Sequence, residues 1–294
     1  MSKGNDDLCF VKYHALGNDY LFLDASRFKL PTMAGIKKIC HRNFGIGSDG
    51  ILYGTKVSDN IFKVQIINPD GTTAEISGNG VRIFARAMFD LGLVTPHSEF
   101  FVKTFKKTVT CNVLSKDQIE VDMGCPLFKD SNIPYFLCGS STFTVNGETY
   151  RYYPVSMGNP HCVIFVDDLS REEVKTAGPL LECNPMFPEK TNVQFAKILD
   201  RNTIAIEIWE RGAGYTLASG SSACAVFAVA RKLNLCSNNV KIHMPGGILH
   251  VKTAKSGNIM QKGPVKQIAT CKLFQRQPVR TFHDTPRKTF PPSE

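Results

Sequence analysis

Short apolar runs, many of them alternating with polar residues or rich in β-branched side chains, dominate the chain and predict a fold built mainly from strands. The runs recur in the same style through both halves of the sequence. The expected strands are 9–16, 21–23, 62–68, 100–104, 109–114 and 119–121 in the first half, and 155–157, 162–166, 193–198, 203–209, 240–244 and 248–251 in the second.

Helical spacing is rarer and is clearest at two places. Apolar residues follow the spacing i, i+3, i+4 and i+7 from Val81 to Met88, and Gly92 ends this pattern. The same spacing runs from Ala223 to Leu233. The sequence therefore predicts one amphipathic helix in each half of the chain.

A serine followed by a glycine introduces each helical pattern, at Ser77-Gly78 and at Ser219-Gly220. The two serines lie 142 positions apart, and a second match, of 16–18 with 157–159, has an offset of 141. Two matches in the same order predict a duplicated α+β unit whose halves face each other. We expect halves of 1–135 and 136–274, followed by a mobile tail at 275–294 that contains several prolines.

The composition is that of a globular protein, with 43% apolar and 21% charged residues in a chain of 294, long enough for two domains. No apolar run approaches the roughly 20 residues that a membrane helix needs. The first residues contain no apolar stretch of signal-peptide length. We therefore expect a cytoplasmic protein.

The ten cysteines and the net charge of +9 do not by themselves specify a site. No C-x-x-C pair is present, so we predict reduced, mostly buried thiols and no metal site. The basic residues alternate with acidic and apolar ones and form no long block. This distribution favours a solvated basic surface, or a preference for small anionic ligands, over nucleic-acid binding.

The first turn of a helix attracts anions, because its N–H groups lack partners within the helix and lie at the positive end of the macrodipole. Two such entrances facing one another would hold one carboxylate from both sides. The alternative is that Ser77 and Ser219 are ordinary N-caps, and the duplicated frame favours the site. Nearby, 68–71 is either a tight hairpin turn or part of that site. Arg211 is either a surface charge or a fork for a carboxylate.

Eight short motifs, spread over nearly the whole chain, make a family recognisable together although each would be weak alone. They are 12–19 (KYHALGND), 45–50 (GIGSDG), 68–71 (NPDG), 78–82 (GNGVR), 156–161 (SMGNPH), 191–192 (TN), 210–214 (ERGAG) and 245–247 (PGG). In these motifs and their order the sequence resembles the diaminopimelate epimerase family of cofactor-independent amino-acid epimerases and racemases.

The resemblance implies an α+β fold of two pseudo-symmetric domains, each a β-sheet wrapped around a central helix, with the active site in the interdomain cleft. It implies catalysis without pyridoxal phosphate, metal or any other cofactor. One cysteine thiolate removes the α-proton, and a second cysteine thiol protonates the opposite face. The two catalytic positions are occupied here by Ser77 and Ser219. A hydroxyl is a far weaker acid than a thiol, so we expect this sequence to bind its substrate and barely turn it over.

Two explanations fit the serines. Natural loss of both cysteines would leave a non-catalytic, amino-acid binding pseudoenzyme. Replacement of both cysteines in an active isomerase would leave a form that holds its ligand without converting it. The motif residues around both positions are mostly intact, which favours the second explanation.

Diaminopimelate is the first expected substrate. Histidine, O-ureidoserine and other specialised amino acids are the alternatives, because Tyr215 and Ser222 depart from the family pattern and are candidate specificity residues. We expect a small-molecule amino acid as the partner, no nucleic acid and no membrane, with a homodimer as one candidate assembly. His14 and His161 are expected to be structural rather than catalytic. The residues expected to bind the substrate are Asn18, Asn68, Gly78, Asn79, Asn159, Asn192, Glu210, Arg211, Gly220 and Ser221.

Overall fold

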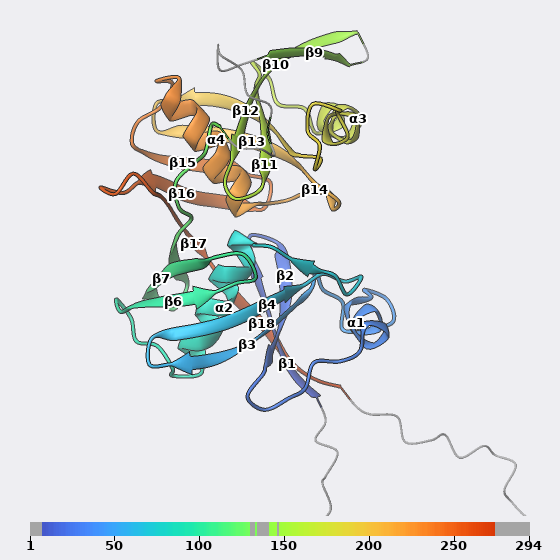
Figure 1. Cartoon of the computed structure of the whole chain (residues 1–294), viewed down its shortest axis with the longest axis vertical. Helices are drawn as coiled ribbons and strands as arrows, with labels where there is room; N and C mark the ends of the chain where they lie inside the picture. The colour runs from blue at the N-terminus through green and yellow to red at the C-terminus, as the bar shows by residue number, and fades with distance from the viewer. Residues whose placement is uncertain (1–7, 130–132, 134–140, 146, 274–294) are drawn as a thin grey trace, which may run out of the picture.

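The computed structural model describes residues 8–129, 133, 141–145 and 147–273, which form two lobes at the two ends of the long axis (Figure 1). The tail predicted at 275–294 lies outside the described residues. In the first lobe the elements are β1 (Leu8–Ala15), β2 (Asn18–Asp24), α1 (Met33–Cys40), β3 (Ile51–Ser58), β4 (Ile61–Ile67), β5 (Thr73–Ala74), α2 (Gly78–Asp90), β6 (Glu99–Lys103), β7 (Thr108–Ser115) and β8 (Gln118–Asp122).

The second lobe follows, and the last two strands run back toward the first. The elements are β9 (Ser141–Val145), β10 (Glu148–Ser156), β11 (Pro160–Phe165), α3 (Arg171–Glu182), β12 (Asn192–Asp200), β13 (Thr203–Glu210), β14 (Gly214–Thr216), α4 (Gly220–Lys232), β15 (Asn239–Met244), β16 (Gly247–Thr253), β17 (Ile259–Pro264) and β18 (Lys266–Leu273).

The two lobes repeat one strand topology. In the first lobe β1 pairs antiparallel with β2, β2 parallel with β3, β3 antiparallel with β4, and β4 parallel with β6. In the second lobe β10, β11, β12, β13 and β15 pair with the same succession of orientations. A long helix occupies the same place in each lobe, α2 after β5 and α4 after β14. The duplicated α+β unit predicted from two short matches is confirmed.

The central helices α2 and α4 form the cores of the two lobes. Every residue of 78–88 and of 220–230 is buried. Strands surround each helix, because α2 contacts β1, β2, β3, β7 and β8, while α4 contacts β10, β11, β12, β15, β16 and β17. A helix that is buried on all sides needs such a wrapping sheet. The predicted α+β fold, with a sheet wrapped around a central helix in each domain, is therefore correct.

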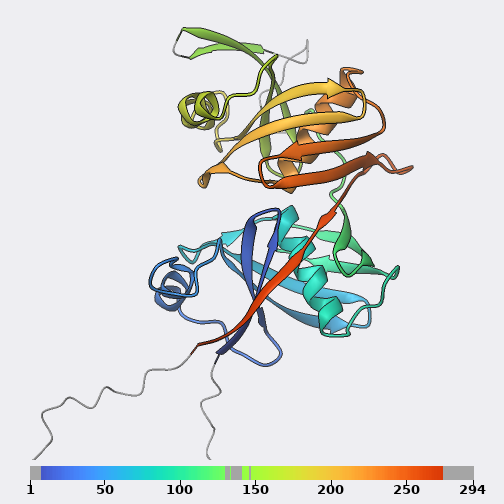
Figure 2. The same cartoon turned by 180° about the vertical axis from the view of Figure 1, so that it is seen from behind.

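Strands that cross between the lobes join them. β17 pairs antiparallel with β8, and β18 returns to pair with β1 (Figure 2). In space the last strand of the chain therefore lies with the first lobe. The predicted boundary between 1–135 and 136–274 falls in a stretch, 134–140, outside the described residues. This division by residue number stays a prediction.

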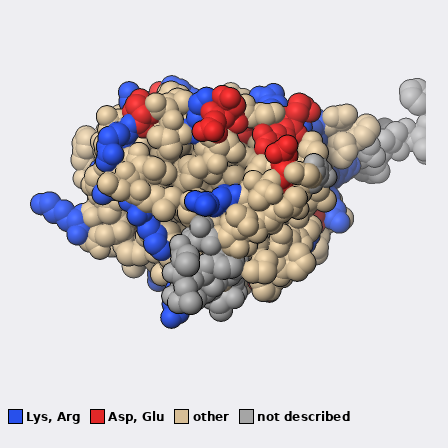
Figure 3. All heavy atoms as spheres, turned by 90° about the horizontal axis from the view of Figure 1, so that it is seen from above, with Lys and Arg blue, Asp and Glu red and all other residues tan. Residues whose placement is uncertain are grey.

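The charged side chains that face the viewer in Figure 3 are scattered over the second lobe. Lys and Arg side chains stand apart from one another on this face, and Asp and Glu gather along one edge. On this face the Lys and Arg side chains form no single patch. No helix among the described residues is long and apolar enough to cross a membrane.

Candidate active site

The N-termini of the two central helices meet where the lobes join, and we call this region the seam. Ser77 caps α2 and its hydroxyl accepts a hydrogen bond from the Gly80 N–H at 3.0 Å. Ser219 caps α4 and accepts from the Ser222 N–H at 3.4 Å. The backbone of both serines is extended, with φ of −138° and −141°. Both N-caps predicted from the sequence are confirmed, and they do not exclude a further role.

Two glycines allow the helix starts to approach each other. A Cβ atom placed on Gly78 would lie 3.2 Å from the Gly220 Cα and 2.6 Å from the Gln261 amide nitrogen. A Cβ placed on Gly220 would lie 2.4 Å from the Gln261 amide oxygen. Glycine at both positions therefore leaves room for the Gln261 amide between the two helix starts. The unpaired N–H groups of two first turns are thereby brought to one place, where an anion is favoured.

Each serine has a second polar neighbour, and the two neighbours differ. Tyr20 lies beside Ser77, and burial raises the pKa of the Tyr20 phenol. Glu210 lies beside Ser219. Burial raises the pKa of the Glu210 carboxyl, the neighbouring Ser219 hydroxyl opposes this, and the charge of Asp49 raises it further. A phenol therefore lies next to the start of α2, and a carboxyl group lies next to the start of α4.

Asn79 ties the two lobes together at the seam. Its amide nitrogen donates to the Ala218 carbonyl at 3.0 Å and to the Asn18 side-chain oxygen at 3.2 Å. The Asn18 amide in turn donates to Asp49 at 2.8 Å. The structure thus places Asn18, Asn79 and Glu210 near the two serines.

A group of charged residues holds the β1–β2 turn next to the seam. Asp19 pairs with Lys12 at 2.9 Å and with Arg42 at 2.8 Å, and Arg42 also reaches Asp49 at 2.6 Å. Burial alone would raise the pKa of Asp19, but the hydrogen bonds from Arg42 and Lys12 outweigh it and hold this pKa below its usual value. These pairs join the motifs 12–19 and 45–50, and they fix Asn18 in place.

In the second lobe a further group of predicted residues is connected. The Asn192 side-chain oxygen accepts from the Arg211 backbone N–H at 3.1 Å, and its amide donates to the Pro160 carbonyl at 2.8 Å. Asn159 hydrogen-bonds the His161 ring at 3.0 Å. The Arg211 guanidinium donates to the Glu189 carbonyl at 3.0 Å. The remaining N–H groups of this partly exposed guanidinium are available to a carboxylate.

Three predicted residues have local partners instead. The Asn68 amide donates to the Thr72 hydroxyl at 3.0 Å, within the tight turn that the sequence offered as the alternative. The Tyr215 hydroxyl donates to Glu207 at 2.6 Å. Tyr215 is the register partner of Trp209, and the strands that carry these two residues, β14 and β13, both contact α3. The Ser222 hydroxyl accepts from Gln194 at 3.0 Å. Specificity roles for Tyr215 and Ser222 stay predictions.

The cysteine nearest to Ser219 in the sequence is Cys224, and its thiol is not a reactive one. Cys224 lies in the second turn of α4 and is fully buried. Burial raises the pKa of its thiol to about 12, and the positive charges of Arg82 and Lys107 offset only part of this effect. Cys224 therefore stays a thiol at neutral pH. Among the described residues no group of three His, Cys, Asp or Glu side chains is arranged to hold a metal ion.

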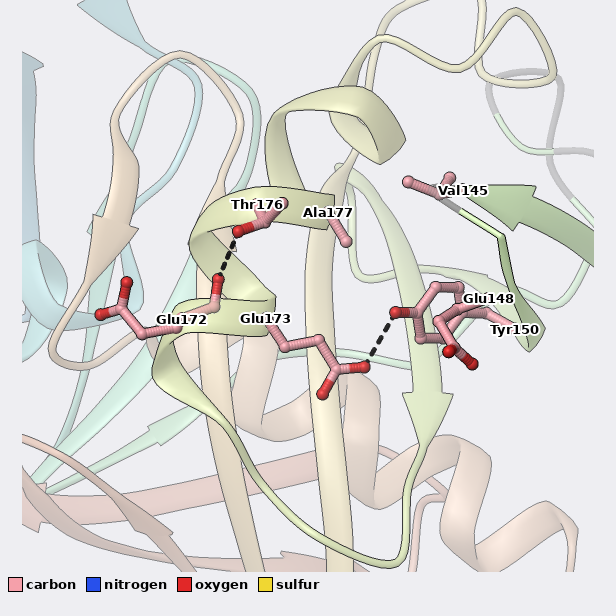
Figure 4. A pocket seen from close by; sticks show the side chains of 7 residues that line it. All are labelled: Val145, Glu148, Tyr150, Glu172, Glu173, Thr176 and Ala177. Carbon is pink, nitrogen blue, oxygen red and sulfur yellow. Dashed lines mark hydrogen bonds between the residues drawn. The ribbon is translucent and has the colours of Figure 1, made fainter.

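A separate hollow of about 270 Å³ lies in the second lobe between α3 and the β9–β10 hairpin (Figure 4). In it Glu173 accepts a hydrogen bond from the Tyr150 hydroxyl at 2.9 Å. None of the residues predicted for the site lies in its wall. The lining residues are Val145, Glu148, Tyr150, Glu172, Glu173, Thr176 and Ala177.

His161 is the most strongly perturbed imidazole near the seam. It is fully buried, and burial lowers its pKa to about 3, since the nearby Gln194 side chain offsets only part of the effect and the charge of Arg211 lowers it further. The ring is therefore neutral at physiological pH and cannot act as a general acid there. This agrees with the structural role expected from the sequence.

Replacing His161 with glutamine is expected to flatten the acid side of the stability profile. The pKa of the folded state lies below that of the unfolded chain, so the unfolded chain binds more protons and stability is lost as the pH falls below about 6.5. This residue alone accounts for about 2 kcal/mol between pH 6.5 and 5. Urea unfolding of both proteins at these two pH values measures the difference, and equal pH dependences would contradict this assignment.

Solved structures with this arrangement define the class of protein. A hydroxyproline epimerase from Agrobacterium vitis superposes with a TM-score of 0.67 and 12% identity, over 93% of this chain and 92% of that one. A protein described as a probable proline racemase from Agrobacterium radiobacter gives 0.69 and 12%, over 92% and 93%. The chain therefore has the two-lobed fold of epimerases and racemases.

Sequence comparison then identifies the family. The model of the family described as diaminopimelate epimerase matches residues 10–129 and 153–268. Diaminopimelate epimerase 2 of a Nostoc species is 45% identical over 272 residues, which cover 90% of this chain and 95% of that protein. The diaminopimelate epimerase of Moorella thermoacetica is 39% identical over 271 residues, covering 88% and 96%. This chain belongs to the diaminopimelate epimerase family.

Proposed function

We propose that the seam binds a free amino acid, and that Ser77 and Ser219 stand at the acid and base positions of a cofactor-independent inversion of its α-carbon. The observation that carries this proposal is the pair of serine-capped helix starts, related by the internal repeat and facing each other across Gly78 and Gly220. Inversion needs an acid and a base on opposite sides of one carbon. A duplicated helix entrance supplies two such positions.

In this account the backbone N–H groups of the two first turns hold the carboxylate at the reacting carbon. They stabilise the negative charge that develops on it as the α-proton leaves. The side chains around the seam orient the rest of the ligand, with Glu210 and its raised pKa beside one face. The proposed backbone donors are those at Gly78, Asn79, Gly220 and Ser221, and the proposed side chains are Asn18, Asn68, Asn159, Asn192, Glu210 and Arg211.

Serine at both positions makes the chain a poor catalyst in this account. The Ser219 hydroxyl accepts the Ser222 N–H as a cap and has Glu210 as a neighbour. A carboxylate is a weaker base than a thiolate, and a hydroxyl stays protonated at neutral pH. We therefore infer that the chain holds its ligand and inverts it slowly or not at all. Replacement of two cysteines in an active isomerase accounts for the otherwise intact site.

Diaminopimelate is the substrate class that we place first. The relatives that cover about nine-tenths of this chain carry that name. Arg211 and Asn192 are connected to each other, and Arg211 retains donors suited to a distal carboxylate. Racemisation of histidine, O-ureidoserine or another amino acid is the alternative within this reaction class, since Tyr215 departs from the family pattern. A non-catalytic binding protein is the alternative from another class, and serine at both positions is the observation that favours it.

Titration calorimetry of the unaltered chain with meso-diaminopimelate tests the proposal. We expect saturable binding of one ligand per chain. Arg211→Ala should weaken it by about tenfold or more, since hydrogen bonds to a charged group contribute about 1.5–3 kcal/mol. Arg201→Ala is the matched control, because Arg201 is exposed and the side-chain hydrogen bonds given for it among the described residues go to Asn234.

If the chain binds histidine and not meso-diaminopimelate, the alternative substrate within the same reaction class is supported. Failure to bind any amino acid of a panel that includes diaminopimelate, histidine and the basic amino acids, by a protein with native circular dichroism, would remove the proposal altogether.

A further inference from the structure

A buried arginine without a carboxylate partner lies directly behind the seam. Arg82, in the second turn of α2, is 0% exposed. Its guanidinium donates to the Asn79 side-chain oxygen at 2.6 Å and to the Gln261 side-chain oxygen at 3.0 Å, while its Nε atom has no partner. Among the described residues it forms no ion pair within 4.0 Å. Arg82 thus donates two hydrogen bonds to neutral side-chain amides, and these amides do not compensate its positive charge.

Gln261 accepts a hydrogen bond from Arg82 and lies where the starts of α2 and α4 meet. It lies on β17, is 0% exposed, and its amide stands between the two helix starts. The amide oxygen lies 2.4 Å from a Cβ placed on Gly220, and the amide nitrogen lies 2.6 Å from a Cβ placed on Gly78. The side-chain oxygen that accepts from Arg82 is therefore in contact with the start of α4. One side-chain amide separates the guanidinium from both first turns.

The same arginine fixes two contacts across the seam. Asn79, whose side-chain oxygen accepts from Arg82, donates to the Ala218 carbonyl just before Ser219. Gln261, its other acceptor, also donates to the Met123 sulfur at 3.0 Å. Lys107, which is half-buried, donates to the Met123 carbonyl at 2.6 Å and adds a second positive charge. The charge of Asp122 acts on Lys107 and partly offsets it, whereas none of the described acidic side chains acts on Arg82.

A charge that is buried without a counter-ion costs several kcal/mol relative to water. Burial lowers the pKa of Arg82 to about 10, which still leaves the guanidinium protonated at neutral pH. A glutamate at position 261 would neutralise it with nearly the same shape. A neutral glutamine leaves the positive charge of Arg82 in place. That charge can then attract an anionic group bound at the first turns of α2 and α4.

We propose that Arg82, left uncompensated by Gln261, supplies the fixed positive charge that holds the carboxylate of the ligand at the seam. Arg82 and Gln261 are positioning residues, because they act through Asn79 and through the electric field rather than by touching the ligand. The ligand part of this inference rests on the proposed function. The potential at the seam does not, and it is measurable without any ligand.

The test uses two changes at position 261 in a Ser77→Cys background, with the full chain. Gln261→Glu gives Arg82 a carboxylate of the same length, while Gln261→Met keeps the volume and leaves the charge. Gln65→Glu is the control for the added acidic group, because Gln65 is exposed on β4. The first readout is the pH profile with which iodoacetamide alkylates the thiol introduced at position 77, followed on its own peptide by mass spectrometry. The second is calorimetry with meso-diaminopimelate.

We expect Gln261→Glu to move the midpoint of this alkylation profile upward by about one pH unit, so that alkylation below the midpoint slows about tenfold. Binding of meso-diaminopimelate should weaken by at least tenfold. Gln261→Met and Gln65→Glu should change each value by less than threefold. Circular dichroism and urea unfolding identify any variant that is not folded, and Gln261→Glu is expected to unfold at an equal or higher urea concentration.

An unchanged alkylation profile in folded Gln261→Glu would overturn the proposal. So would a shifted profile accompanied by undiminished binding of meso-diaminopimelate. If the profile shifts but the parent chain itself binds no diaminopimelate, the charge at the seam is established and the proposed function is what fails.

Discussion

Introducing cysteine at both positions, with Ser77→Cys and Ser219→Cys, is expected to raise the rate of α-carbon inversion by about 10²–10⁴-fold, the usual contribution of a positioned acid or base. A thiol has a reference pKa near 8.5, and the start of a helix lowers it further, so a useful fraction becomes thiolate at neutral pH. Ser77 and Ser219 each cap such a helix start. The uncompensated Arg82 should favour the thiolates in addition.

Chiral chromatography, together with deuterium incorporation from solvent, measures this effect on diaminopimelate, histidine and the basic amino acids. Ser58→Cys with Ser256→Cys is the matched control, because both serines are exposed and neither lies at a helix start. The control should behave as the parent does. A folded double variant that binds an amino acid and neither exchanges nor inverts it would show that the two positions are not an acid and base pair.

Truncating the core of the first lobe, with Phe84→Ala, is expected to cost about 3–5 kcal/mol of the free energy of unfolding. Phe84 lies on α2, is 0% exposed and packs on Phe22 with a ring-centroid distance of 6.0 Å. A Cβ placed on Gly54 would lie 2.6 Å from its ring. The strands therefore close tightly around this side chain and leave a cavity when it is removed. Urea unfolding measures the loss.

The control is Phe44→Ala, since Phe44 is 80% exposed and its loss should change the free energy by no more than about 0.5 kcal/mol. A loss below about 1.5 kcal/mol for Phe84→Ala would mean that the sheet does not hold the helix as tightly as the packing indicates. Because α2 carries Ser77 at its start, a loosened core should also weaken ligand binding.

The two helix entrances could be predicted because their signals are local. Serine, glycine and an apolar pattern of helical spacing lie within a few residues of each other at Ser77 and again at Ser219. Capping and burial both depend on such short-range patterns. The strands that carry a clear apolar alternation were predictable for the same reason, and β1, β4, β7, β12 and β13 lie at the expected places.

The outer helices could not be predicted, because their sequences contain contrary signals. α3 contains Gly178-Pro179, a pair that usually interrupts a helix. Tertiary packing explains the glycine, since a Cβ there would lie 2.7 Å from the Trp209 ring. α1 has eight residues and only three buried side chains, too few for a pattern to stand out.

The contacts behind the seam also could not be predicted from the sequence. Gln261 reaches Arg82 across 179 positions, and Tyr20 meets Ser77 only once the sheet has folded. No local pattern indicates such contacts. The crossing of β17 and β18 has the same origin, because each strand pairs with the first lobe through long-range registers. A duplicated sequence predicts two similar lobes and not how they exchange strands.

In the proposed function the two serines face opposite sides of one α-carbon. The stereospecificity of α-deuterium incorporation tests this arrangement in the two single variants, Ser77→Cys and Ser219→Cys, each given both antipodes of one amino acid that the chain binds. Each variant should exchange the α-hydrogen of one antipode without inverting it, and the two variants should act on opposite antipodes. Exchange of the same antipode by both variants would contradict the claim, because the two positions would then lie on the same side of the carbon.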